Sequence, residues 1–179
     1  MISRLVLFLF IPLIISCSNS ISNDTILDDF PEENFTTLGS DGPYIYGEKY
    51  SGRNNYINYY PGNIPIVLSI PHGGELTPFE ISDRTYGVSV TDSNTIELGS
   101  SISDYMYEIF NVRPYLIINN LKRTKLDANR DKIEAAQNNI FAERAFDEFH
   151  YYISSAREDI IKNFGSGILF DIHGHGPNP

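Results

Sequence analysis

The sequence predicts an α/β fold with a mostly parallel sheet, because short apolar runs alternate with longer amphipathic segments. Three apolar runs, residues 66–70, 115–118 and 168–170, are separated by two segments in which apolar residues recur at helical spacing, 94–110 and 142–160. A strand–helix–strand–helix–strand order is typical of parallel strands joined by crossover helices. We therefore expect a three-layer α/β/α arrangement.

The N-terminal segment has the composition of an export signal. Arg4 precedes an apolar stretch, residues 5–15, that is too short for a permanent membrane-spanning helix. The stretch ends in a small residue and then Cys17, which resembles the lipobox of bacterial lipoproteins. Cys17 is the only cysteine, so an intramolecular disulfide is impossible. We expect a signal peptide over 1–16, a lipid anchor that holds Cys17 to the membrane, and a flexible tether over 17–40; a cleaved secretory peptide with an incidental cysteine is the alternative.

Such a protein faces the periplasm or the exterior from the bacterial cell envelope. The rest of the chain, residues 41–179, is long enough for one domain with a hydrophobic core. The whole chain has a formal net charge of −10, which argues against a nucleic-acid partner because such a partner requires a basic surface. We expect a single soluble α/β domain at the end of the tether.

The order of elements within this domain follows from local patterns. Residues 41–63 have no clear period and predict loops or short strands. The run at 66–70 lies between two prolines, as a buried strand does. Helical spacing predicts an amphipathic helix over 94–110, followed by a buried strand at 115–118. The helical pattern of 142–160 ends near a glycine and leads into the third strand.

Polar motifs follow each of the three predicted strands. Residues 72–75 read His-Gly-Gly-Glu, residues 123–130 begin and end with arginine, and residues 171–175 read Asp-Ile-His-Gly-His. In open parallel sheets, ligands bind beyond the carboxyl ends of the strands. Three segments that are distant in the sequence are therefore expected to converge on one site.

Two histidines and one carboxylate are a common ligand set for catalytic zinc. His72 and His173 are the candidate imidazole ligands, and Glu75 can fold back to the same metal across two glycines. Asp92 is the alternative third ligand; it lies at the start of the helix over 94–110, where it would cap the helix, reach the metal or orient a ligand histidine. Each histidine alone would be interpreted as a hydrogen-bonded loop residue.

The second motif is unusually basic for so acidic a chain. Arg123, Asn129 and Arg130 are candidates for binding a substrate carboxylate, and an arginine near a metal can stabilise an oxyanion. The alternative is a solvated loop in which these charges pair with Asp127 and Asp131.

Taken together, four blocks resemble the N-formylglutamate amidohydrolases, within the zinc carboxypeptidase and aspartoacylase superfamily. The blocks are Ser69–Gly74 followed by Thr77-Pro78, Asp92 with Leu98, Arg123 with Leu126–Arg130, and Leu169–His173. The resemblance runs from about residue 65 to the last residues. Each block is weakly specific alone, but the order and spacing make the set more specific.

The resemblance implies a phosphorylase/hydrolase-like α/β/α fold and zinc-dependent hydrolysis of a carboxamide in an N-acyl amino acid. His72 and His173 would bind zinc, and Glu75 or Asp92 would be the third ligand. Arg123, with Asn129 and Arg130, would hold the substrate carboxylate and the developing oxyanion.

Two features depart from the family. The chain ends just after the last histidine motif, where the superfamily continues with further strands and a glutamate general base, so we expect a C-terminally truncated domain. The family's best-known enzymes are cytoplasmic, whereas an exported protein is expected to act on a different N-acyl amino acid or peptide.

Two other functions remain to be weighed. A non-catalytic ligand-binding lipoprotein would keep the fold and the arginines without the chemistry. A serine hydrolase using Ser69 or Ser89 with His72 is less favoured, because neither serine has the flanking glycines of a nucleophile elbow.

Overall fold

The computed structural model describes residues 42–175 of the 179-residue chain. The expected signal peptide over 1–16, the lipid anchor at Cys17 and the tether over 17–40 lie outside the described residues.

Five strands form one mixed sheet in the order β1-β2-β4-β3-β5. β3 pairs in parallel with both β4 and β5, whereas β2 pairs antiparallel with β1 and with β4. The strands are β1 (Tyr50–Ser51), β2 (Ile57–Tyr60), β3 (Ile66–Ile70), β4 (Tyr115–Asn119) and β5 (Ile168–Asp171). The helices are the 3₁₀ turn η2 (Arg53–Asn55), α1 (Thr95–Phe110), α2 (Lys132–Ala136) and α3 (Ile140–Phe164).

The structure confirms the α/β class and the three strands and two long helices expected from the sequence. The sheet is mixed rather than mostly parallel, because residues 41–63 contain the short strands β1 and β2, which add an antiparallel edge. The sequence analysis also missed α2, a helix of five residues. Periodicity cannot show elements this short, since β1, β2 and α2 have two, four and five residues.

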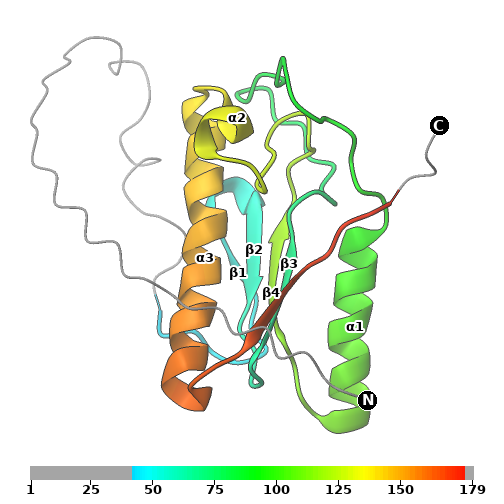
Figure 1. Cartoon of the computed structure of the whole chain (residues 1–179), viewed down its shortest axis with the longest axis vertical. Coiled ribbons are helices and arrows are strands. Elements are labelled where there is room, and N and C mark those ends of the chain that lie inside the picture. The colour runs from blue at the N-terminus through cyan, green and yellow to red at the C-terminus, as the bar shows by residue number, and fades with distance from the viewer. Residues whose placement is uncertain (1–41, 176–179) are drawn as a thin grey trace, which may run out of the picture. The chain divides into compact units, whose positions relative to one another are not determined.

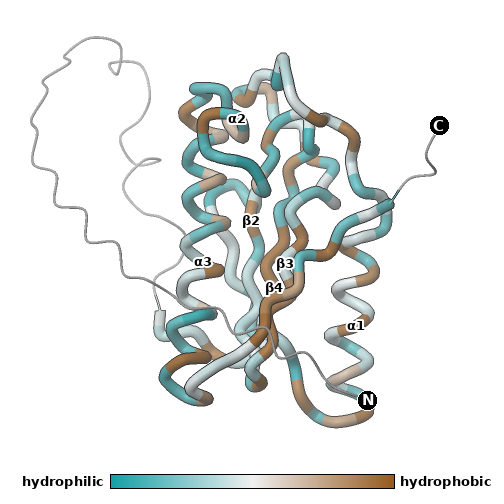
Figure 2. The backbone as a smooth tube through the Cα atoms, in the orientation of Figure 1, coloured by the Kyte–Doolittle hydropathy of each residue, from teal (hydrophilic) through white to brown (hydrophobic). Residues whose placement is uncertain are grey.

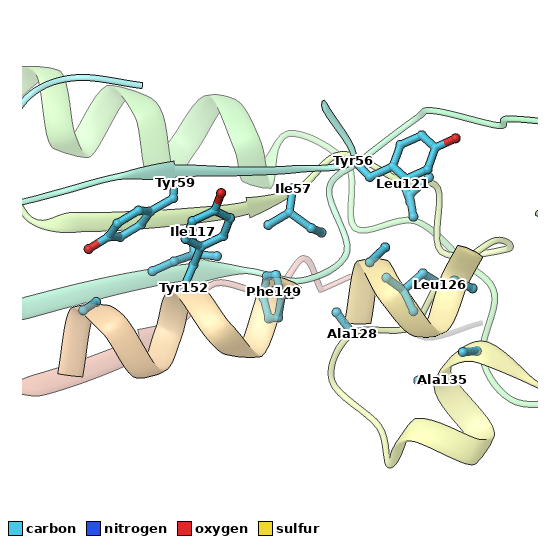
Figure 3. Packing of buried hydrophobic residues seen from close by; sticks show 14 of the residues in the cluster. Tyr56, Ile57, Tyr59, Ile117, Leu121, Leu126, Ala128, Ala135, Phe149 and Tyr152 are labelled. Atoms are coloured by element: carbon cyan, nitrogen blue, oxygen red, sulfur yellow. The ribbon is translucent and has the colours of Figure 1, made fainter. Parts of the chain in front are cut away.

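One face of the sheet packs against α3. Sheet residues Ile57, Tyr59 and Ile117 share a buried cluster with Phe149 and Tyr152 of α3 (Figure 3). The rings of Tyr59 and Tyr152 stack with their centroids 4.9 Å apart. Alternate strand residues point to opposite faces, so this cluster takes every second residue of β2 and β4.

Four residues on the other face of β3 and β4 form a smaller cluster with α1. Leu68, Ile70, Leu116 and Ile118 are buried there, with Ile96 and Ile102 of α1 packed against them. β3 and β4 are accordingly among the most hydrophobic segments of the chain and lie between the two long helices (Figure 2). The strands β3 and β4 are therefore buried on both faces, as the prolines and apolar runs in the sequence indicated.

Side-chain caps and a glycine set the ends of α3. The amide oxygen of Asn139 accepts hydrogen bonds from the backbone N–H groups of Phe141 and Ala142. At the other end, Gly165 takes a positive φ of 78°, which glycine adopts without steric cost. Within residues 42–175, no helix is long and apolar enough to cross a bilayer.

Candidate metal centre

His72 is held at the carboxyl end of β3 by a turn that only glycine permits. The side-chain amide of Asn119 donates to the Pro71 carbonyl at 2.8 Å and fixes the chain before the histidine. A Cβ at Gly74 would lie 2.1 Å from the backbone carbonyl carbon of Asn120. The loop after β3 can therefore run against the loop after β4 only without a side chain at this position, which leaves His72 almost fully buried.

His173 and Asp92 reach the same point from two other segments. β5 ends two residues before His173, and the chain then passes the start of α1, where Asp92 lies (Figure 1). The backbone N–H of Asp92 donates to the His72 carbonyl at 3.0 Å, and that of Gly174 donates to the Asp92 carboxylate at 3.1 Å. Asp92 does not cap α1, since Asn94 is the residue that precedes the helix.

Three ligand atoms of these side chains form a nearly equilateral triangle. The Nδ1 atoms of His72 and His173 are 3.2 Å apart. Asp92 Oδ2 lies 3.2 Å from His173 Nδ1 and 3.4 Å from His72 Nδ1. Tetrahedral coordination with metal–ligand bonds of about 2.05 Å places neighbouring ligands about 3.3 Å apart. The spacing of these three ligand atoms therefore suits one metal ion.

A buried carboxylate fixes the orientation of His72. Asp127 Oδ1 lies 2.6 Å from His72 Nε2, and the Asp127 side chain has no solvent exposure. Burial alone would raise the pKa of Asp127, but the hydrogen bonds and charges of His72 and Arg123 outweigh it and hold the pKa well below the usual range. When the His72 ring is neutral, the ionised carboxylate favours the tautomer with its proton on Nε2, and Nδ1 is then available as a metal ligand.

Asn129 has the corresponding place behind His173. Its side-chain amide lies 3.1 Å from His173 Nε2, and its backbone N–H donates to Asp127 Oδ1 at 3.2 Å. If His173 binds a metal through Nδ1, its proton is on Nε2, and the Asn129 side chain must then present its amide oxygen to the ring. A rotation of the Asn129 side-chain amide exchanges its oxygen and nitrogen. Each imidazole therefore has a partner that can select its tautomer.

Arg123 joins the two carboxylates of the site. Its Nε donates to Asp127 Oδ2 at 3.0 Å, and one terminal nitrogen lies 3.4 Å from Asp92 Oδ1. The same nitrogen donates to the Val90 carbonyl at 3.3 Å. Arg123 is buried, so its charge neutralises carboxylates that would otherwise be costly to bury.

Two of the sequence candidates lie outside the group. The Glu75 side chain is 68% exposed and pairs with Lys122 at 3.3 Å. Of the two candidate third ligands, Asp92 therefore lies with the histidines and Glu75 does not. Arg130 is partly exposed, donates to the Asn129 carbonyl at 3.0 Å and lies 3.5 Å from Glu134.

The arrangement of the serines does not support a serine hydrolase. Ser69 is fully buried in β3, and its hydroxyl has no hydrogen-bond partner within the described structure. Ser89 is exposed. Both ring nitrogens of His72 face other groups, Asp127 on one side and the His173–Asp92 pair on the other.

Sequence reasoning missed two residues that support the site. Asp127 was predicted to pair with loop charges and belongs to the block that resembles the amidohydrolases, but it was given no role in the site, although it lies between Leu126 and Ala128, which are both fully buried. An acidic residue between two small or apolar core residues is the signal that could have identified it. Arg84 gave no signal; it is buried, donates to the Val88 and Arg123 carbonyls at 2.7 and 3.0 Å, and lies 3.8 Å from Asp127.

Comparison with known proteins adds no relative: no family model, curated protein or solved structure matches the chain.

Proposed function

We propose that this protein is a zinc-dependent hydrolase of carboxamide bonds in N-acyl amino acids or peptides, anchored by lipid in the bacterial cell envelope. The proposal includes membership of the N-formylglutamate amidohydrolase family and a three-layer α/β/α fold of the phosphorylase/hydrolase type. The single observation that carries it is the triangle of His72, Asp92 and His173, with sides of 3.2, 3.2 and 3.4 Å.

The donor set is the reason for proposing zinc. Two neutral imidazoles and one carboxylate suit zinc and leave a fourth position for water or substrate, as in catalytic rather than structural sites. Calcium and magnesium prefer oxygen ligands and larger coordination numbers, so two nitrogen donors disfavour them. The carboxylate behind His72 is the kind of outer partner that catalytic zinc sites usually have.

Each supporting residue has a role that follows from its contacts. Zinc at this position would polarise the amide carbonyl of a substrate and lower the pKa of water. Asp127 and Asn129 orient the two imidazoles, and Arg123 pairs with both Asp92 and Asp127. Arg123 is thus a positioning residue, and Arg130, whose side chain is partly exposed, is the better candidate to bind a substrate carboxylate.

The first test is the zinc content of the purified full chain by elemental analysis. We expect about one zinc per chain, lost in a His72→Ala/His173→Ala double variant, because a single remaining carboxylate does not hold zinc tightly. His175→Ala is the matched control, since this histidine follows the same strand but is not part of the group. It should retain its zinc.

The second test is hydrolysis. The zinc-loaded chain is incubated with N-formyl, N-acetyl and peptidyl amino acids, and release of the free amine is followed. Turnover that disappears with the double variant supports the enzyme. Stoichiometric zinc without turnover supports the non-catalytic ligand-binding alternative. Arg123 already contacts two carboxylates of the protein, which disfavours a role for this residue in binding substrate. A folded chain that takes up no supplied zinc refutes the zinc enzyme and favours the ligand-binding alternative.

A further inference from the structure

Asp92, the carboxylate of the proposed metal centre, lies at the end of a segment without regular secondary structure. Residues 71–94 join β3 to α1, and residues 88–92 within them belong to no helix or strand. Helices and strands fix their residues through repeating backbone hydrogen bonds, which this segment lacks. The position of Asp92 must therefore be set by contacts with other parts of the chain.

Two arginine side chains contact every second residue of this segment. Arg84 donates through Nη1 to the Val88 carbonyl at 2.7 Å. Arg123 has its Nη1 atom 3.3 Å from the Val90 carbonyl and 3.4 Å from Asp92 Oδ1. Arginine donors therefore hold residues 88, 90 and 92 in place of a strand or helix.

The two arginines are exchanged between the loop after β3 and the loop after β4. Arg123 comes from the β4 loop and reaches residues 90–92. Arg84 comes from the β3 loop and reaches back, since its Nη1 donates to the Arg123 carbonyl at 3.0 Å and its backbone N–H donates to the Thr124 carbonyl at 2.7 Å. Its Nε also donates to the Glu134 carbonyl of α2 at 3.2 Å. Arg84 thus connects three segments.

The distances indicate that Arg84 acts through carbonyl groups and not as the direct partner of a carboxylate. Its three carbonyl contacts measure 2.7–3.2 Å. Its terminal nitrogens are 3.8 Å from Asp127 Oδ2 and 3.8 Å from Glu134 Oε1, which is beyond hydrogen-bond length. A planar guanidinium with forked donors suits several carbonyls at once, whereas the ammonium group of lysine is a single compact charge.

The turn after Arg84 encloses its guanidinium. Gly87 has a positive φ of 81°, and a Cβ there would lie 2.6 Å from Arg84 Nη2 and 2.7 Å from Glu134 Oε1. The Arg84 side chain is only 1% exposed. The guanidinium is therefore held between its own loop and α2, and its donors have fixed directions.

We propose that Arg84 is a positioning residue of the metal centre, which together with Arg123 holds residues 88–92 so that Asp92 meets the two histidines. The inference rests on the proposed function for the metal itself. Arg84 contacts no candidate ligand; it acts through the backbone of Val88 and through Arg123. Without it, the chain before Asp92 gains conformational freedom that must be lost again when a metal binds.

The test compares Arg84→Lys with wild type, because lysine keeps the positive charge but lacks the forked donors. Hydrogen exchange of the Asp92 N–H, which donates to the His72 carbonyl, is measured by NMR in the metal-free full chain. We expect this exchange to be at least about tenfold faster in the variant. Zinc affinity, from chelator competition, should be about 10- to 100-fold lower. A role in charge neutralisation alone would leave both values as in wild type and would overturn the proposal.

Arg53→Lys is the matched control. Arg53 contacts the buried carboxylate of Glu148 at 2.7 Å, and neither residue belongs to the three segments that Arg84 connects. This variant replaces another arginine that faces a buried acid, so it carries a similar cost in stability. It should leave the exchange of the Asp92 N–H and the zinc affinity of the folded chain unchanged.

A double-mutant cycle separates action through Asp92 from a general loss of stability. When Asp92 is already alanine, Arg84→Lys should lower zinc affinity by less than about threefold, because the ligand that it positions is absent. Gly87→Ala presses on the guanidinium without changing any charge, and it should give the same faster exchange if Arg84→Lys does not fold.

Two results would overturn the proposal. One is an Asp92 N–H that exchanges as in wild type in the folded variants, and the other is an equal loss of zinc affinity with and without Asp92. A wild type that binds no zinc instead refutes the zinc enzyme, and the exchange measurement then still decides whether Arg84 holds residues 88–92.

Discussion

Replacing Asp127 by asparagine removes one charge behind the proposed metal centre without changing its volume. The wild-type carboxylate accepts from His72 Nε2 at 2.6 Å through one oxygen and from Arg123 Nε at 3.0 Å through the other. An amide has one acceptor and one donor end, so it can satisfy only one of these two donors. If the NH₂ group faces His72, the ring is driven to the tautomer with its proton on Nδ1, toward the metal position.

The magnitude has two parts. Loss of an outer partner of a metal-binding histidine lowers metal affinity by about 10- to 100-fold. This corresponds to about 1.4–2.7 kcal/mol of binding free energy. Arg123 also loses the neutralising charge of a buried partner, and breaking a buried pair costs about 3–5 kcal/mol of folding free energy. Zinc affinity and apo stability should therefore both fall, by amounts that can be measured separately.

Zinc affinity is measured by competition with a chromophoric chelator, and the free energy of unfolding of the metal-free chain by urea titration. Asp104→Asn is the matched control, because Asp104 is exposed and pairs with Arg113 at 2.8 Å away from the site. Surface pairs of this kind contribute about 0–1 kcal/mol. A folded Asp127→Asn chain with the zinc affinity of wild type would refute the tautomer argument.

Three further outcomes follow from the same structure. Asp92→Ala should weaken zinc binding by about 100-fold or more, since a ligand is lost, whereas Glu75→Ala should bind zinc as wild type does; the reverse result in the chelator assay would make Glu75 the ligand. Burial, and then the hydrogen bond to Glu80, raise the pKa of Tyr56 to about 12, and burial raises that of Tyr59. The tyrosine hydroxyls of an unfolded chain lose their protons near pH 10, whereas those of Tyr56 and Tyr59 in the folded chain retain them. The free energy of unfolding should therefore fall as pH rises above about 10. A urea midpoint that stays constant between pH 9 and 11 would refute this. Gly74→Ala should destabilise the chain by about 1–3 kcal/mol, because the new methyl group meets backbone 2.1 Å away; an unchanged melting temperature would contradict this close approach.

The long elements of this fold could be predicted because each has a local physical signature. The apolar run at 66–70 between two prolines and the helical pattern ending at Gly165 correspond to β3 and α3 in the structure. The sequence also placed His72 and His173 after the ends of apolar strands, of which β3 is buried and β5 is exposed. Parallel strands bring their carboxyl ends to one edge, so the meeting of these two histidines followed from topology alone.

The remainder depended on contacts between segments that are distant in the sequence. Spacing suggested Glu75 as third ligand because it is near His72 in the chain, but the tertiary structure brings Asp92 to the histidines and leaves Glu75 paired with Lys122. Asp127 likewise faces His72 across 55 residues. Local sequence sets the backbone of each segment, whereas the donor geometry of the site is set by how three loops pack together, and no local pattern encodes that packing.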